Sequence, residues 1–145
     1  MTSGKKRILI VDDDADFAEA VSFFLEENGY RVLTARDGRE GLKLAKMERP
    51  DLIIMDIVMN ERTEGFFTVQ ELRRTVELKN VPIFVLSSLY SQISDFRVAP
   101  DSGWLGHDEF FSKPADMPQL LEKIRRRIGG PDQAGGSPSN REAEL

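Results

Sequence analysis

Short apolar runs alternate with longer amphipathic stretches along most of the chain. Five runs have the length and the β-branched or aromatic content of buried strands: 7–12, 30–35, 51–56, 81–86 and 109–112. Strands that are apolar on both faces are typical of a parallel sheet that is covered by helices. The pattern therefore predicts strands that alternate with helices.

Helical periodicity fills the connections between these runs. It is clear in four stretches: after Asp14, after Asp37, around Leu72 and from Met117 to Ile128. Asp14 suits the N-cap of the first helix. The third helix carries Val69, Leu72 and Val76 on one face, so all three are expected in the core. After Leu89 the helical spacing lasts for about two turns, before Pro and Gly residues interrupt it.

Parallel strands need crossover connections, and these connections are right-handed. The sequence therefore predicts an α/β fold of the flavodoxin-like type: a doubly wound, five-stranded parallel sheet with strand order 2-1-3-4-5 and helices on both faces. We expect one folded domain over residues 5–129. Residues 130–145 are rich in Gly, Pro, Ser and charged side chains, and they predict a flexible C-terminal tail.

Composition narrows the classes of function. The formal net charge of -5 argues against direct binding of nucleic acid, so protein partners are expected. The absence of cysteine excludes thiol nucleophiles and zinc-thiolate sites. The apolar run near the N-terminus is too short for a signal peptide or a membrane span. We expect a cytoplasmic protein that does not bind membranes.

Polar and charged side chains come where the predicted strands end. Asp12 closes the first strand and Asp13 follows it, Asp56 closes the third, Ser87 follows the fourth and Lys113 follows the fifth. In an open parallel sheet, the carboxyl ends of neighbouring strands meet at one edge, and ligands bind there. These five side chains are therefore expected to converge on one crevice.

Three neighbouring carboxylates repel one another, and a divalent cation relieves that repulsion. Mg2+ takes oxygen ligands at about 2.0 to 2.1 Å, usually one or two carboxylates, water and a phosphate oxygen. A lysine and a hydroxyl group nearby add a positive charge and a hydrogen-bond donor. The residues themselves thus favour phosphoryl transfer onto Asp56 with Mg2+ as cofactor.

Four motifs resemble the receiver domains of two-component response regulators, and the resemblance covers about residues 5–128. The motifs are Ile10-Val11-Asp12-Asp13, Asp51-Leu52-Ile53-Ile54-Met55-Asp56, Pro82-Ile83-Phe84-Val85-Leu86-Ser87-Ser88 and Phe110-Phe111-Ser112-Lys113-Pro114. All four occur in the order of the family and at spacings close to those of the family.

The resemblance implies a role for each residue. Asp56 is the phospho-acceptor, Ser87 and Lys113 contact the phosphoryl group, and Phe110 is the aromatic residue of the switch. The implied metal ligands are three carboxylates and one backbone carbonyl: Asp12, Asp13, Asp56 and Val58.

The resemblance predicts a single-domain response regulator, similar to the chemotaxis regulators. It would accept a phosphoryl group from a sensor histidine kinase or a phosphotransfer protein and switch its binding to a downstream protein target. Its own chemistry would be limited to its phosphorylation and dephosphorylation, so it is not expected to be an enzyme.

Two alternatives remain. Asn60 stands where the family mostly has proline, and Gly65 lies one residue further from Asp56 than is usual. The spacing from Ser87 to Lys113 is also about four residues longer than is common. These departures favour a docking module that works without phosphorylation. A Mg2+-dependent phosphatase of the haloacid dehalogenase type is the other alternative, but it needs an aspartate where this chain has Val58.

Overall fold

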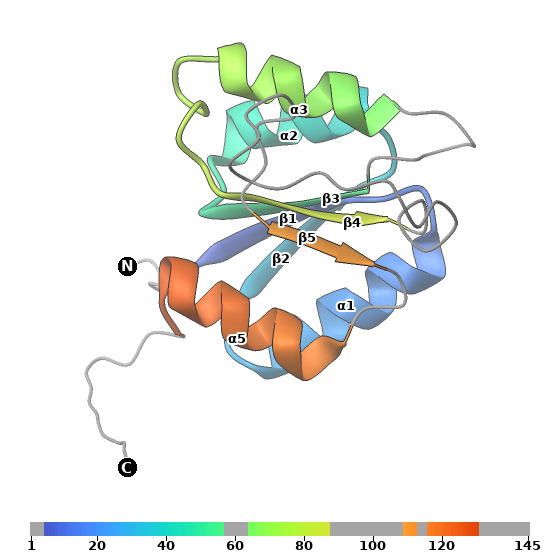
Figure 1. Cartoon of the computed structure of the whole chain (residues 1–145), viewed down its shortest axis with the longest axis vertical. Helices are drawn as coiled ribbons and strands as arrows, with labels where there is room; N and C mark the ends of the chain where they lie inside the picture. The colour runs from blue at the N-terminus through green and yellow to red at the C-terminus, as the bar shows by residue number, and fades with distance from the viewer. Residues whose placement is uncertain (1–4, 57–63, 88–108, 113–115, 131–145) are drawn as a thin grey trace.

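The structure is a computed structural model of the chain, and it describes residues 5–56, 64–87, 109–112 and 116–130. One parallel sheet has the strand order β2-β1-β3-β4-β5, as predicted (Figure 1). The strands are Arg7–Val11 (β1), Arg31–Ala35 (β2), Leu52–Asp56 (β3), Ile83–Ser87 (β4) and Glu109–Ser112 (β5). Each strand coincides closely with one of the five apolar runs.

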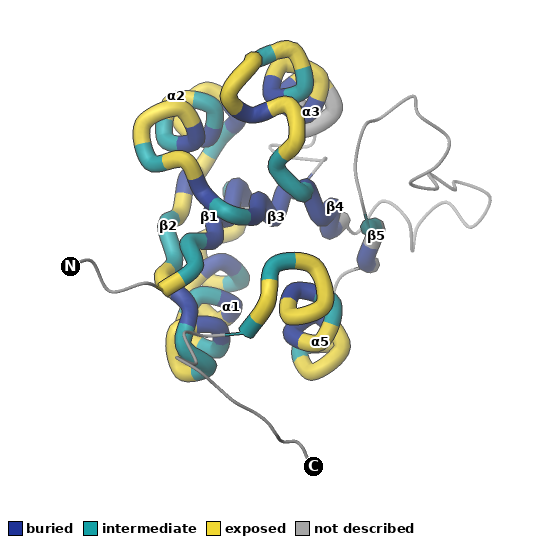
Figure 2. Tube along the Cα trace, turned by 90° about the vertical axis from the view of Figure 1, so that its left-hand side faces the viewer, coloured by how far each residue is buried: buried dark blue, intermediate teal, exposed yellow. Residues whose placement is uncertain are grey.

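Helices cover both faces of the sheet. They are Ala15–Glu27 (α1), Gly38–Glu48 (α2), Glu64–Arg74 (α3) and Met117–Ile128 (α5). Figure 1 shows α2 and α3 on one face and α1 and α5 on the other. The buried positions of these helices face the sheet, and their exposed positions face outward (Figure 2). The described helices are all too short and too polar to cross a membrane.

The core has two halves, one on each face of the sheet. Successive side chains of a strand point to opposite faces. In β1, Ile8 and Ile10 therefore pack in the cluster that contains residues of α1 and α5, whereas Leu9 and Val11 pack in the cluster on the side of α2 and α3. This explains why the central strands are apolar at every position.

Aspartates define where three helices begin. Asp14, Asp37 and Asp116 precede α1, α2 and α5, and each carboxylate accepts a hydrogen bond from a backbone N–H in the first turn. These bonds satisfy amide groups that have no partner inside the helix. The prediction that Asp14 caps the first helix is confirmed.

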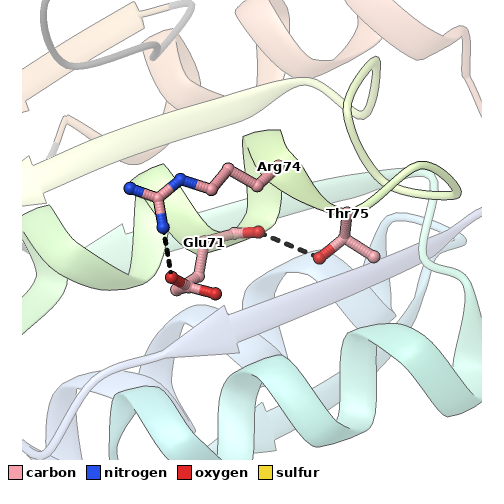
Figure 3. A network of polar contacts seen from close by, with 3 residues as sticks. All are labelled: Glu71, Arg74 and Thr75. Carbon is pink, nitrogen blue, oxygen red and sulfur yellow. Dashed lines mark hydrogen bonds and ion pairs between the residues drawn. The ribbon is translucent and has the colours of Figure 1, made fainter.

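The prediction that Val76 faces the core is wrong. α3 ends at Arg74, so Val76 lies beyond the helix, where it is 77% exposed, and Leu78 is buried instead. The Thr75 hydroxyl donates a hydrogen bond of 2.9 Å to the backbone carbonyl of Glu71 (Figure 3). Such a bond from a threonine side chain offers the backbone an alternative to the regular helix.

Tyr30 connects the start of β2 to the end of α5. Its side chain is 1% exposed, and its hydroxyl donates a hydrogen bond of 2.7 Å to the carbonyl of Gly129. Burial raises the pKa of the Tyr30 phenol, and the nearby Arg125 guanidinium opposes this effect only partly.

The predicted helical turns after Leu89 lie outside the described residues. So does the predicted tail, apart from its first residue, Gly130. The domain boundaries at 5–129 and 130–145 stay a prediction.

Candidate functional site

Strand register brings two buried aspartates to the same edge of the sheet. β1 and β3 are neighbours in which Val11 aligns with Met55, and an aspartate follows each of these residues. Asp12 is 3% exposed and Asp56 is 4% exposed. Asp13 joins them, because carboxylate oxygens of Asp12, Asp13 and Asp56 all lie within 4.8 Å of one another. The predicted convergence of these three side chains is therefore observed.

The backbone around Asp12 is held from two sides. The Asp12 N–H donates a hydrogen bond of 3.0 Å to the carbonyl of Ala35, at the end of β2. The Asp14 N–H donates a bond of 2.9 Å to Oδ1 of Asp12. Asp14 also caps α1, so the first turn of this helix and the second strand together fix where the Asp12 carboxylate lies.

Sequence reasoning gave Asp14 a role only as a helix cap and missed its contact with Asp12. A bond from an aspartate side chain to the backbone N–H two residues later is a common turn motif. The run Asp12-Asp13-Asp14 contains the signal for it. The same short segment therefore supplies carboxylates to the site and holds one of them in place.

The geometry of the carboxylates fits a hard divalent cation. In an octahedral Mg2+ site, neighbouring ligand oxygens are about 3.0 Å apart and opposite ones about 4.2 Å apart. The 4.8 Å within which the three carboxylate oxygens lie exceeds the larger value only slightly. Small side-chain movements would therefore bring these oxygens to metal-ligand distances, and the charge of the cation would offset their mutual repulsion.

Ser87 is the last residue of the strand next to Asp56. Asp56 aligns with Leu86, so the backbone of Ser87 lies one residue further along β4. Ser87 in turn aligns with Ser112, the last residue of β5. The side chain of Ser87 lies outside the described part of the structure.

The remaining predicted site residues are placed less fully. Val58 and Lys113 lie outside the described residues, although Lys113 directly follows the end of β5 in the sequence. Phe110 lies in β5, where it aligns with Val85, but its side chain is not described. The roles predicted for these residues and for the three carboxylates stay predictions.

Comparison with known proteins assigns the family. The model of the response regulator receiver domain family matches residues 8–125. The DNA-binding dual master transcriptional regulator RpaA of Synechocystis is 37% identical over 127 residues, which are 88% of this chain and 51% of RpaA. Protein PilH of Pseudomonas aeruginosa is 32% identical over 127 residues, which are 86% of this chain and 98% of PilH.

A solved structure agrees with this assignment. The response regulator TrrA of Thermotoga maritima in complex with Mg2+-BeF superimposes with a TM-score of 0.70 at 32% identity, over 85% of this chain and 99% of that one.

The chain spans about half the length of the first curated relatives that it matches. Response regulator receiver domains are signalling modules of two-component systems rather than enzymes. Since the family model matches most of the chain and the fold is that of its solved relatives, the protein belongs to the response regulator receiver domain family.

Proposed function

We propose that Asp56 accepts a phosphoryl group from a histidine of a sensor kinase or of a phosphotransfer protein. Phosphorylation then changes how this domain binds a downstream protein. The observation that carries the proposal is the meeting of Asp12, Asp13 and Asp56 at the carboxyl ends of two adjacent strands.

In the proposed step, a carboxylate oxygen of Asp56 forms a bond to phosphorus while the bond between phosphorus and the donor histidine nitrogen breaks. The imidazole of the donor leaves and stays on the partner protein. Asp12, Asp13, Asp56 and the backbone carbonyl of Val58 would hold Mg2+, which neutralises charge on the phosphoryl oxygens when it is bound.

Lys113 and Ser87 complete the proposed phosphoryl site. The sheet order β3-β4-β5 supports this, since each of these strands ends next to its neighbour. Lys113 would pair with a phosphoryl oxygen, and the Ser87 hydroxyl would donate a hydrogen bond to another. Phe110 lies in β5, the strand next to β4. Its side chain would repack when Ser87 turns toward the phosphoryl group. This movement would couple the site to the surface around β5 and α5.

The relatives support the choice of metal and of chemistry. TrrA, which is similar to this chain over most of its length, was solved with Mg2+-BeF. We place the receiver domain at residues 5–129 and the C-terminal tail at 130–145. We also propose a cytoplasmic location, where a kinase donor would be available, and no direct contact with nucleic acid, because the net charge is -5.

The test is the intact mass of the protein after incubation with a small phosphodonor, with and without Mg2+. We expect a gain of about 80 Da, one phosphoryl group, only when Mg2+ is present. Asp56→Asn removes the acceptor oxygen and should abolish the gain. Asp16→Asn is the matched control, since Asp16 is an exposed aspartate in the first turn of α1 and should leave the gain unchanged.

Two results would contradict the proposal. A gain that persists in Asp56→Asn would place the phosphoryl group elsewhere. No gain under any condition would favour the docking module that works without phosphorylation, and partner binding would then be compared between the parent protein and Asp56→Asn.

A further inference from the structure

The outward face of α1 carries only negative charge. The helix contains no lysine or arginine, and its exposed side chains include four carboxylates and one aromatic ring: Asp16, Glu19, Glu26, Glu27 and Phe23. The ring of Phe23 is 67% exposed. Glu26 and Glu27 lie in the last turn, where the helix dipole disfavours negative charge. The stability of the helix therefore does not explain why these carboxylates are there.

The outward face of α2 carries mainly positive charge. Arg39, Lys43 and Lys46 are exposed at spacings of four and three residues, so they lie along one side of the helix. Met47, next to Lys46, is 63% exposed. Glu40 is the exposed carboxylate of this helix, and it already accepts a hydrogen bond of 2.9 Å from a backbone N–H before the first turn.

The charges of these two faces are not neutralised within the described part of the molecule. The ion pairs formed there involve other side chains than the four carboxylates of α1 and the three cations of α2. Like charges three or four residues apart on a helix destabilise it. Each helix thus has an unfavourable charge pattern that a surface of opposite charge would relieve.

The two faces complement each other in charge and in apolar contact. Each has one large apolar side chain among its charges, Phe23 on α1 and Met47 on α2. A thioether and an aromatic ring attract each other when they meet. With Met47 opposite Phe23, a parallel pairing of the helices brings Lys43 to Glu19, and an antiparallel pairing brings Lys43 to Glu27. Unlike charges therefore meet in either direction.

We propose that α1 of one copy of this chain binds α2 of a second copy. The two helices cover opposite faces of the sheet, so they cannot pair within one molecule (Figure 1). Each copy keeps one unused face of each kind, so the contact is heterologous and can repeat. A small interface with exposed charges gives weak association, with a Kd of about 0.1 to 1 mM at low salt. The association does not require phosphorylation of Asp56.

Sedimentation equilibrium of the unphosphorylated protein tests this proposal. A chelator is included, so that metal ions cannot bridge carboxylates of two copies. At about 0.02 M NaCl, we expect the mean mass to rise above the 16.4 kDa of the monomer as the protein concentration approaches about 1 mM. At about 0.5 M NaCl, where charges are screened within a few ångströms, the affinity should fall at least about fivefold.

Two charge reversals locate the contact. Lys43→Glu and Glu19→Lys should each weaken self-association about tenfold. The first makes the net charge of -5 more negative and the second makes it less negative, so a general effect of net charge cannot explain both losses. An equal mixture of the two variants should associate like the parent protein, because the unchanged α1 of one variant meets the unchanged α2 of the other. This recovery also shows that both variants are folded.

The matched controls are Lys79→Glu and Glu77→Lys. Both residues are exposed in the turn before β4, and these variants make the same changes in charge away from α1 and α2. Their affinities should equal that of the parent protein.

Three results would overturn the proposal. The first is a monomer mass at every concentration at low salt, which would leave the two faces to other proteins of opposite charge. The second is a loss of affinity in Lys79→Glu as large as that in Lys43→Glu. The third is a mixture of Lys43→Glu and Glu19→Lys that associates no better than either variant alone.

Discussion

At the scale of single residues, burial and one hydrogen bond both favour the protonated form of the Tyr30 phenol. The phenol is almost fully buried, and its hydroxyl donates to the carbonyl of Gly129. A phenolate at this position would lose the donor and would also lose its hydration. The folded state therefore prefers the protonated form, and the pKa of Tyr30 is raised.

A raised pKa predicts how stability depends on pH. Below about pH 10, the ordinary pKa of tyrosine, Tyr30 is protonated in both states and its contribution to stability is complete. As the pH rises through about 10, the unfolded chain loses this proton first, so the free energy of unfolding falls until the folded pKa is passed. Urea unfolding of the parent protein and of Tyr30→Phe at a series of pH values measures this.

We expect Tyr30→Phe to cost about 0.5 to 1.5 kcal/mol at neutral pH, where the hydrogen bond is lost. The difference between the two proteins should shrink above about pH 10. A difference that stays constant up to pH 11 would contradict the link between the phenol proton and folding.

At the scale of elements, Gly41 sets how closely α2 approaches β1. A Cβ atom at this buried position would lie 2.7 Å from Cγ2 of Val11, which is too close for a real contact. Val11 is itself fully buried, and its branched side chain cannot move away easily. The helix can therefore lie against this strand only because residue 41 has no side chain.

We expect Gly41→Ala to destabilise the domain by about 1 to 2 kcal/mol. Overpacking a core costs about 1 to 3 kcal/mol, and the better helix propensity of alanine returns up to about 1 kcal/mol. Thermal unfolding checks this against Lys43→Ala, an exposed change in the same helix that should have little effect. A melting temperature for Gly41→Ala equal to that of the control would show that α2 shifts without cost.

The elements themselves were largely predictable from the sequence. The central strands β1, β3 and β4 are buried on both faces, so their apolar runs are unambiguous, and aspartate caps mark the starts of three helices. The end of α3 was not predictable from periodicity, because Val76 continues the apolar spacing of Leu72. The Thr75 hydroxyl bonds to a backbone carbonyl there, and the chain turns instead.

At the scale of the whole molecule, metal binding should be linked to stability. A cation that binds only the folded protein stabilises it by about 2.7 kcal/mol when its concentration is 100 times the dissociation constant. Because the unfolded chain does not hold Asp12, Asp13 and Asp56 together, we expect Mg2+ to raise the melting temperature by several degrees.

Asp13→Asn should remove most of this rise, since it replaces one of the three carboxylates. Scanning calorimetry with MgCl2, compared with NaCl of equal ionic strength, makes the measurement. An equal rise for the parent protein and for Asp13→Asn would mean that the cation acts elsewhere.

The meeting of the three carboxylates was predictable because parallel strands deliver their last residues to one edge, whatever the identity of those residues. The hydrogen bond from Asp14 to Asp12 was not predicted. It depends on how side chains and turns pack after the fold has formed, and the spacing of residues in the sequence does not encode that directly.

The bond between Tyr30 and Gly129 also has a consequence for biosynthesis. Its partners are 99 positions apart in the chain. At about 5 to 20 residues per second, the ribosome makes Gly129 roughly 5 to 20 s after Tyr30. During that interval, the tyrosine and the face of the sheet that α5 covers have no native cover. A nascent chain cannot complete this half of its core until synthesis of the domain is almost finished.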